Sequence, residues 1–86
     1  MQIRFTRHAV QKSAVLKRHG ISISRRRIIR AVEQPDLVDY TRLPLLIAQT
    51  NLDERRVLRV VYRIEKDAMV IITFYPGRKS QYEKEN

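Results

Sequence analysis

Cationic side chains and a tyrosine gather near two predicted strands in the C-terminal half of this 86-residue chain. Runs rich in β-branched residues at 55–64 and 69–75, separated by a polar turn at 65–68, predict a hairpin. Five residues on or after these strands could handle a phosphate: Arg59, Arg63, Arg78, Lys79 and Tyr82. Cations beside a phenol are what binding or cleaving a phosphodiester requires.

Arg59 is the strongest candidate of this group. It lies within an apolar strand, where burying a guanidinium is costly unless an anion meets it. Arg63 lies two positions beyond Val61, as Arg59 lies two positions before it, so both arginines project from one face. For Arg63 the alternative is an exposed strand residue that limits edge pairing. We expect Arg59 in a site and Arg63 as a substrate-binding candidate.

Arg78, Lys79 and Tyr82 follow the second strand closely. They could form a phosphate clamp beside a phenol, and flanking cations favour the phenolate that could act as a base. The alternative is a solvated C-terminal segment, because this spacing is not a specific motif.

The net charge of +9 is concentrated in the N-terminal third of the chain. Residues 1–30 hold nine Lys and Arg and no Asp or Glu, whereas residues 31–86 hold nine of each sign. Such a patch attracts polyanions, which here could be RNA, DNA or an acidic protein segment. The alternative is a basic face kept for solubility.

Two features of the predicted helices extend this basic surface. Arg26 and Arg27 fall at the start of the second helix, where the helix dipole disfavours cations, and Arg30 shares their arc. An anion held at that helix end would resolve the conflict. His8 falls in the first turn of the first helix, where its charged form is disfavoured; a proton shuttle or a plain surface histidine both fit.

Several classes of function are disfavoured by composition. The chain has no cysteine, so disulfides and thiolate metal sites are excluded. Two glycines and no P-loop make a nucleotide cofactor unexpected, and no zinc-ligand spacing occurs. No apolar run reaches the roughly 18 residues of a membrane span, and the N-terminus does not resemble a signal peptide. We therefore expect a cytoplasmic protein with no metal, cofactor or membrane partner.

The predicted fold is α+β with one domain over residues 1–86. Helices are expected at about 7–19, capped by Thr6, and from Ser22 or Ser24 to just before Pro35. Strands are expected at 37–42, 45–50, 55–64 and 69–75, the last ending at Pro76-Gly77. The two helices should cover one face of a four-stranded antiparallel meander.

The hairpin can be phased by placing Ile64 opposite Met69. The face expected to be the core then carries these residues: Leu58, Val60, Tyr62, Ile64, Met69, Ile71, Thr73 and Tyr75. The opposite face carries Val57, Arg59, Val61, Arg63, Val70, Ile72 and Phe74. A partner, a second copy of the chain or a substrate could cover that mixed face.

The C-terminal half resembles the RelE/ParE toxin superfamily. The resemblance rests on Arg59-Val60-Val61-Tyr62, the following aliphatic strand, and Gly77-Arg78 with Tyr82. The N-terminal half, with Phe5-Thr6-Arg7-His8-Ala9, Arg18-His19-Gly20-Ile21-Ser22 and Gln34-Pro35-Asp36, is similar to a neighbouring family of short uncharacterised proteins and distantly to BrnT toxins. The lysines that RelE-like nucleases often carry on the preceding strand are replaced here by Leu45-Leu46-Ile47-Ala48-Gln49.

The resemblance implies a RelE-like fold and, for RelE-like members, metal-free cleavage of mRNA on the ribosome. It points to Arg59 and Arg78 as stabilisers of transition-state charge and to Tyr82 as the group that takes the 2′-hydroxyl proton. We therefore expect a toxin of a toxin–antitoxin pair that acts as an endoribonuclease, with RNA or the ribosome and an acidic antitoxin as partners. The alternatives are a ParE-like gyrase inhibitor and a basic RNA- or protein-binding module, since one scaffold serves several functions.

Overall fold

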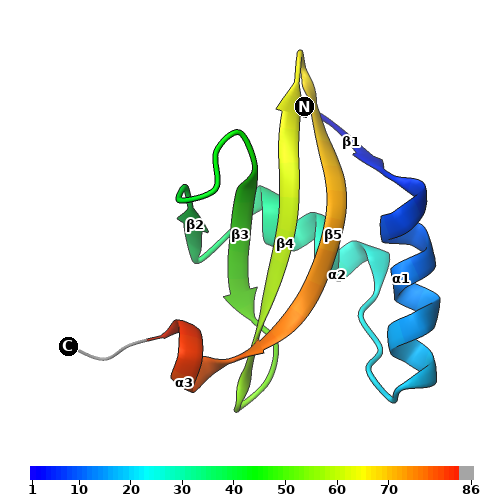
Figure 1. Ribbon diagram of the computed structural model, residues 1–86, viewed down its shortest axis with the longest axis vertical. Helices are drawn as coiled ribbons and strands as arrows, with labels where there is room; N and C mark the ends of the chain where they lie inside the picture. Colours follow the sequence, from blue (N-terminus) through cyan, green and yellow to red (C-terminus); the bar gives the residue numbers. More distant parts are fainter. Residues whose placement is uncertain (84–86) are drawn as a thin grey trace.

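Residues 1–83 are described by a computed structural model, in which one mixed sheet carries two helices on one face (Figure 1). Within this range five strands lie in the order β1-β5-β4-β3-β2. The strands are β1 (Gln2–Phe5), β2 (Leu37–Asp39), β3 (Leu46–Asn51), β4 (Arg56–Glu65) and β5 (Ala68–Arg78). The helices are α1 (Arg7–Arg18), α2 (Arg25–Glu33) and α3 (Lys79–Tyr82). The α+β class is confirmed.

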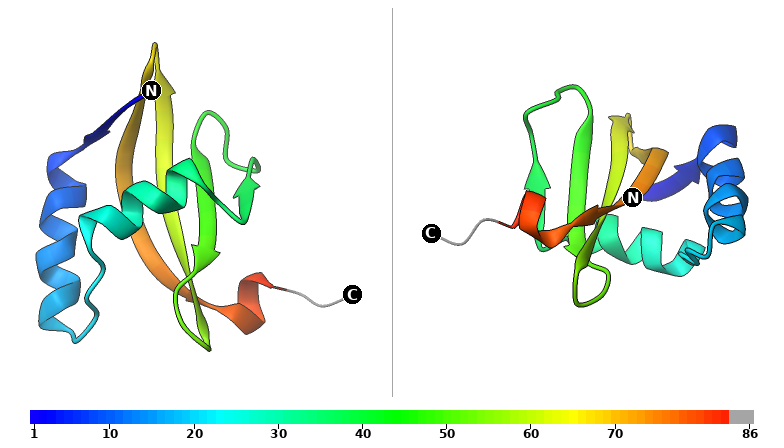
Figure 2. Two further views of the ribbon diagram at one scale, coloured as in Figure 1. Left: turned by 180° about the vertical axis from the view of Figure 1, so that it is seen from behind. Right: turned by 60° about the horizontal axis from the view of Figure 1, so that its bottom comes forward.

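The first two helices begin at the residues that can cap them. The Thr6 hydroxyl accepts a hydrogen bond from the Ala9 amide at 3.2 Å, and the Ser24 hydroxyl accepts one from the Arg27 amide at 3.1 Å. α1 is followed by Gly20 at φ 82°, a conformation that glycine adopts without strain. The view from behind shows α2 lying across the sheet (Figure 2, left).

The sheet is larger than the sequence predicted. β2, β3, β4 and β5 pair antiparallel in chain order, and β1 adds a fifth strand that is parallel to β5. The prediction of four antiparallel strands was therefore incomplete. The missed strand has only four residues, and its partner lies more than sixty residues away, so no local turn signal accompanies it. β5 also continues through Pro76 to Arg78, because beyond Ile71 it pairs only with β4 and its other edge can lack an N–H donor.

A bulge in β5 changes which side chains reach the core. Ile64 pairs with Met69 as predicted, but Val61 pairs with Thr73 and Tyr62 with Ile71, which leaves Ile72 as an extra residue. Beyond this point the alternation in β5 is inverted. Thr73 and Tyr75 therefore share the face of Val61, and their assignment to the core was wrong.

The core lies between the sheet and the two larger helices. Phe74, which was predicted on the opposite face, is fully buried in this core, whereas Ile64 is exposed. The cluster consists of Ala9, Ile23, Ile28, Ala31, Val32, Ala48, Leu58, Val60, Tyr62, Ile71 and Phe74. The other sheet face, called here the open face, is free of α1 and α2 and is turned toward the viewer in Figure 1. Within residues 1–83 no helix is long and apolar enough to cross a membrane.

Candidate functional site

Arg59 lies at the centre of the open face and is almost completely buried. It belongs to β4, where Gln49 of β3 is its partner on one side and Tyr75 of β5 its partner on the other. Only 5% of Arg59 and 2% of Gln49 are exposed. A buried guanidinium must be paired with acceptors, and the neighbouring strands supply them.

Three neighbours accept hydrogen bonds from the Arg59 guanidinium. Its Nε donates to the Tyr75 hydroxyl at 3.0 Å, one terminal nitrogen donates to the Gln49 amide oxygen, and the other donates to Asp39 Oδ2 at 2.9 Å. The four residues come from β2, β3, β4 and β5, so one network runs across four strands. The prediction that an anion must meet Arg59 is satisfied within the chain, by Asp39.

Asp39 remains ionised over the physiological range. The Thr41 hydroxyl donates to Asp39 Oδ1 at 2.6 Å and the Thr41 amide at 2.9 Å. These two hydrogen bonds, followed by the one from Arg59, lower the pKa of Asp39 from 3.8 to about 2. Burial opposes ionisation of Arg59, but the hydrogen bonds to Tyr75 and Asp39 and the electrostatic effect of Tyr75 and Tyr82 raise its pKa. The pair is therefore a permanent ion pair.

Tyr82 closes the network from the side of the solvent. The Arg59 guanidinium carbon lies 4.2 Å from the centre of the Tyr82 ring, within the range of a cation–π contact. The ring also lies directly over Gly77, where an added Cβ would stand 2.5 Å from Tyr82 Cε2. Glycine at position 77 thus makes room for the tyrosine. Tyr82 reaches this place because α3, a single turn after β5, packs against β4 and β5.

A concavity of about 380 Å³ lies beside this stack. Its lining combines the polar network with aliphatic side chains: Asp39, Thr41, Arg42, Leu45, Ile47, Arg59, Val61, Tyr75 and Tyr82. Arg42 is exposed and, within residues 1–83, has no carboxylate within salt-bridge distance. A free cation and a phenol therefore border one concavity, which suits an anionic ligand.

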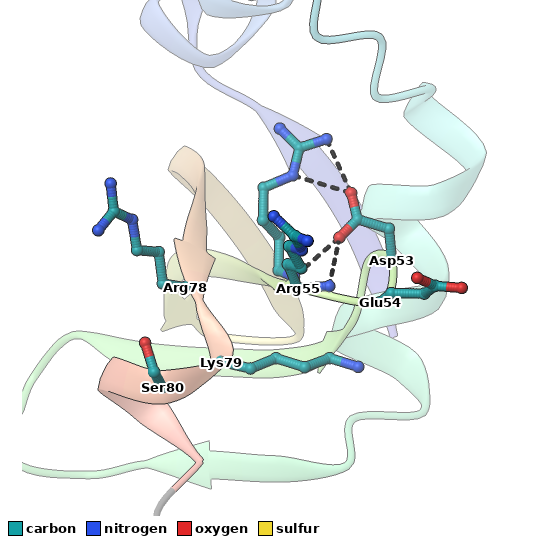
Figure 3. Close-up of a pocket in the computed structure, with 7 residues that line it drawn as sticks. Asp53, Glu54, Arg55, Arg78, Lys79 and Ser80 are labelled. Carbon is teal, nitrogen blue, oxygen red and sulfur yellow. Dashed lines mark hydrogen bonds and ion pairs between the residues drawn. The ribbon is translucent and has the colours of Figure 1, made fainter.

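The structure separates Arg78 and Lys79 from Arg59 and Tyr82. Both line another hollow, of about 860 Å³, together with Asp53, Arg55 and Ser80 (Figure 3). Arg78 is the β5 partner of Arg56, and the Lys79 amide donates to the Arg55 carbonyl at 2.8 Å. Of the three predicted catalytic residues, the concavity beside the stack thus brings together two.

The remaining substrate-binding candidates lie elsewhere. Arg63 shares the open face with Arg59 but bonds to Glu65 at 3.4 Å and does not line the concavity. His8 is an exposed residue of α1. Three of the four arginines of α2 are exposed around a hollow of about 550 Å³, which they share with Asp36 and Thr50: Arg26, Arg27 and Arg30. That hollow adjoins α2 on the face of the sheet opposite to Arg59.

Sequence reasoning missed four residues of the site: Asp39, Arg42, Gln49 and Tyr75. Asp39 and Gln49 gave a usable signal, because each is a polar residue that directly follows apolar residues within its strand. Arg42 and Thr41 lie in the loop after β2, and sequence spacing does not place that loop beside β4. In residues 1–83 no cluster of three or more His, Asp or Glu side chains could hold a metal ion.

Comparison with known proteins found no relative of this chain. No family model matches it, and no curated protein or solved structure is significantly similar to it.

Proposed function

We propose that this chain is an RNA-acting protein of the RelE/ParE toxin type and cleaves RNA as a metal-independent endoribonuclease. The observation that carries the proposal is the placement of Tyr82 over Arg59 at the edge of the concavity that Arg42 also lines. A phenol held by a buried cation, next to a free guanidinium, provides the two functions that metal-free phosphodiester cleavage needs. These are a proton acceptor and a partner for the phosphate.

In the proposed reaction the substrate's own 2′-hydroxyl is the nucleophile. The phenolate of Tyr82 accepts its proton, and the 2′-oxygen forms a bond to the adjacent phosphorus. The bond from phosphorus to the 5′-oxygen breaks, that oxygen takes a proton from water, and the resulting hydroxide takes the proton back from Tyr82. The products are a 2′,3′-cyclic phosphate and a 5′-hydroxyl. Arg42, at the concavity, is the cation available to the phosphate in the transition state.

Arg59 acts in this proposal as a positioning residue. Three of its five N–H donors are bound within the chain, and Asp39 balances its charge. Its accessible contribution is the guanidinium plane on which the Tyr82 ring rests. Arg78 lines the other hollow, so we do not assign it a contact with the reacting phosphate.

A second candidate function rests on the same ion pair. Because Asp39 neutralises Arg59, the open face could bind a macromolecule without cutting it, as a ParE-like inhibitor or a basic RNA- or protein-binding module would. An acidic antitoxin is the partner that either toxin reading implies. A gene for a small acidic protein beside this one would support both readings.

Induced expression with mapping of transcript ends separates the two candidates. If the chain is a nuclease, its expression should arrest growth and produce new RNA ends that carry 2′,3′-cyclic phosphates. Tyr82→Phe should abolish both effects. Growth arrest with intact transcripts would favour a ParE-like target. Normal growth of cells that contain the folded protein would contradict both toxin readings.

A further inference from the structure

A second cationic hollow adjoins α3, and its lining includes neither Arg59 nor Tyr82. Two segments meet there: the turn that precedes β4, and the junction of β5 with α3 (Figure 3). The hollow of about 860 Å³ is lined by Asp53, Glu54, Arg55, Arg56, Arg78, Lys79 and Ser80. Four cations therefore meet two carboxylates around one space.

One of the two carboxylates is already committed. Asp53 accepts hydrogen bonds from the Arg55 and Arg56 amides at 2.9 and 2.8 Å, and its other oxygen accepts one from Arg56 Nε at 2.8 Å (dashed in Figure 3). Those bonds hold the turn and lower the pKa of Asp53, with the Arg56 side chain as the largest cause. Asp53 thus neutralises Arg56, which leaves the single carboxylate of Glu54 against the other three cations of the lining.

The backbone holds the four cations of the hollow close to one another. Arg56 and Arg78 are direct partners in the β4–β5 ladder, a position where like charges are destabilising. The Lys79 amide binds the Arg55 carbonyl at 2.8 Å, which fixes these two residues side by side. In the described part of the chain, Arg55, Arg78 and Lys79 have no carboxylate within 4.0 Å. A bound anion would relieve the repulsion.

The chemistry of the hollow favours phosphate over a protein carboxylate patch. Guanidinium groups match the oxygens of phosphate with paired hydrogen bonds, and a serine hydroxyl adds one donor. Protein partners usually also need an apolar or aromatic anchor. None of the large exposed apolar side chains in residues 1–83 lines this hollow: Met1, Val10, Val15, Leu37, Tyr40, Leu43 and Ile64.

We propose that Arg55, Arg78 and Lys79 bind backbone phosphates of a single-stranded RNA whose neighbouring segment occupies the concavity beside Tyr82. This inference rests on the proposed function, because it assigns RNA as the ligand. Lys79 and Tyr82 are three residues apart on the single turn of α3 and so lie on the same side of it. α3 thus carries one residue of each site, and a strand that crosses it reaches both.

Binding of an uncleavable RNA tests this subsite independently of catalysis. The probe is a fluorescein-labelled 12-nucleotide RNA with a 2′-O-methyl group on every sugar, followed by fluorescence anisotropy over a salt series. The test variant is Arg55→Gln with Lys79→Gln, which preserves the backbone contact between the two residues. The control is Arg18→Gln with Lys66→Gln, which removes the same charges from two exposed residues that line neither hollow.

Each phosphate contact on a single strand contributes about 0.7 to the salt slope, or roughly fivefold in affinity at 0.1 M salt. The test variant should lose roughly 10- to 25-fold in affinity with a shallower slope, and the control should change little by comparison. Equal affinities for test and control variants would overturn the subsite, even if unmodified RNA is cleaved. An equal loss of affinity for poly-glutamate would also overturn it, because the hollow would then select charge and not phosphate. The predicted loss with no cleavage of unmodified RNA would uphold the subsite and reject the nuclease.

Discussion

The guanidinium of Arg59 lies 4.2 Å from the centre of the Tyr82 ring, although 23 residues separate the two in the chain. Gly77 makes the contact sterically feasible, because any larger residue at that position would collide with the ring. The stack links the buried network of four strands to the short helix α3. Substitutions in the buried network or in α3 should therefore alter the position of Tyr82.

Gly77→Ala should displace Tyr82 without altering any group of the proposed chemistry. The new Cβ would stand 2.5 Å from Tyr82 Cε2, so the ring must leave its place over Arg59. We expect a loss of about 1–2 kcal/mol in unfolding free energy from the broken cation–π contact and its packing. RNA cleavage should fall at least tenfold. Urea unfolding and a cleavage assay on the same preparation measure both.

Gly20→Ala is the matched control for that change. Gly20 has a φ of 82° and no atoms within 4 Å of its would-be Cβ, so alanine costs about 1 kcal/mol of backbone strain at a distance from the site. It should lower stability and leave cleavage intact. If both variants lose cleavage in proportion to their stability, the specific role of Gly77 is wrong.

Asp39→Asn should remove a pH-dependent contribution to stability. The pKa of Asp39 is lowered to about 2 in the fold from 3.8, so the ionised carboxylate stabilises the protein above pH 3.8, and this contribution disappears as the pH falls through about 2. We expect a contribution of about 1–2 kcal/mol, because the partly exposed side chain is screened by solvent. Chemical unfolding at neutral pH and in acid should show the variant less stable only at the higher pH.

Asp67→Asn, in the exposed turn between β4 and β5, serves as the comparison and should follow the wild-type curve. A constant difference between Asp39→Asn and the wild type at every pH would contradict a contribution from the charge of Asp39.

Phe74→Ala and Tyr75→Phe test the faces that the β5 bulge creates. Phe74 is fully buried in the core, so its truncation should cost about 3–5 kcal/mol. Tyr75→Phe removes only the acceptor for Arg59 Nε and should cost about 1 kcal/mol. Thermal unfolding distinguishes these values. The reverse order of costs would place Tyr75 in the core and remove it from the network.

The predictable part of this fold is the part with local signals. Thr6 gave the start of the first helix, and Ser24 was one of two residues expected to start the second. The polar turn at 65–68 gave the hairpin and its Ile64–Met69 pairing. The bulge at Ile72 has no such signal. It lies in a continuous aliphatic run, in which the sequence does not show which alternate residues face the core. That single residue exchanged the faces of Phe74 and Tyr75.

The candidate site was only half predictable for a similar reason. Arg59 stood out as a charge within an apolar strand, and Tyr82 as a phenol among cations. Arg78 lies in the same basic segment of the sequence as Tyr82. It nevertheless lines a different hollow because of the direction in which β5 passes into α3. Asp39 becomes the partner of Arg59 only through the pairing of three strands.

The most direct measurement is the cleavage rate of purified Tyr82→Phe on a defined single-stranded RNA in the presence of EDTA. Phenylalanine retains a ring to rest on Arg59 and lacks the hydroxyl, so we predict an intact fold and a rate at least 100-fold below that of the wild type. Tyr40→Phe, at an exposed tyrosine, should cleave at the wild-type rate. Cleavage by Tyr82→Phe at the wild-type rate would show that Tyr82 is not the base, and a wild-type protein that needs a metal to cleave at all would contradict metal-independent cleavage.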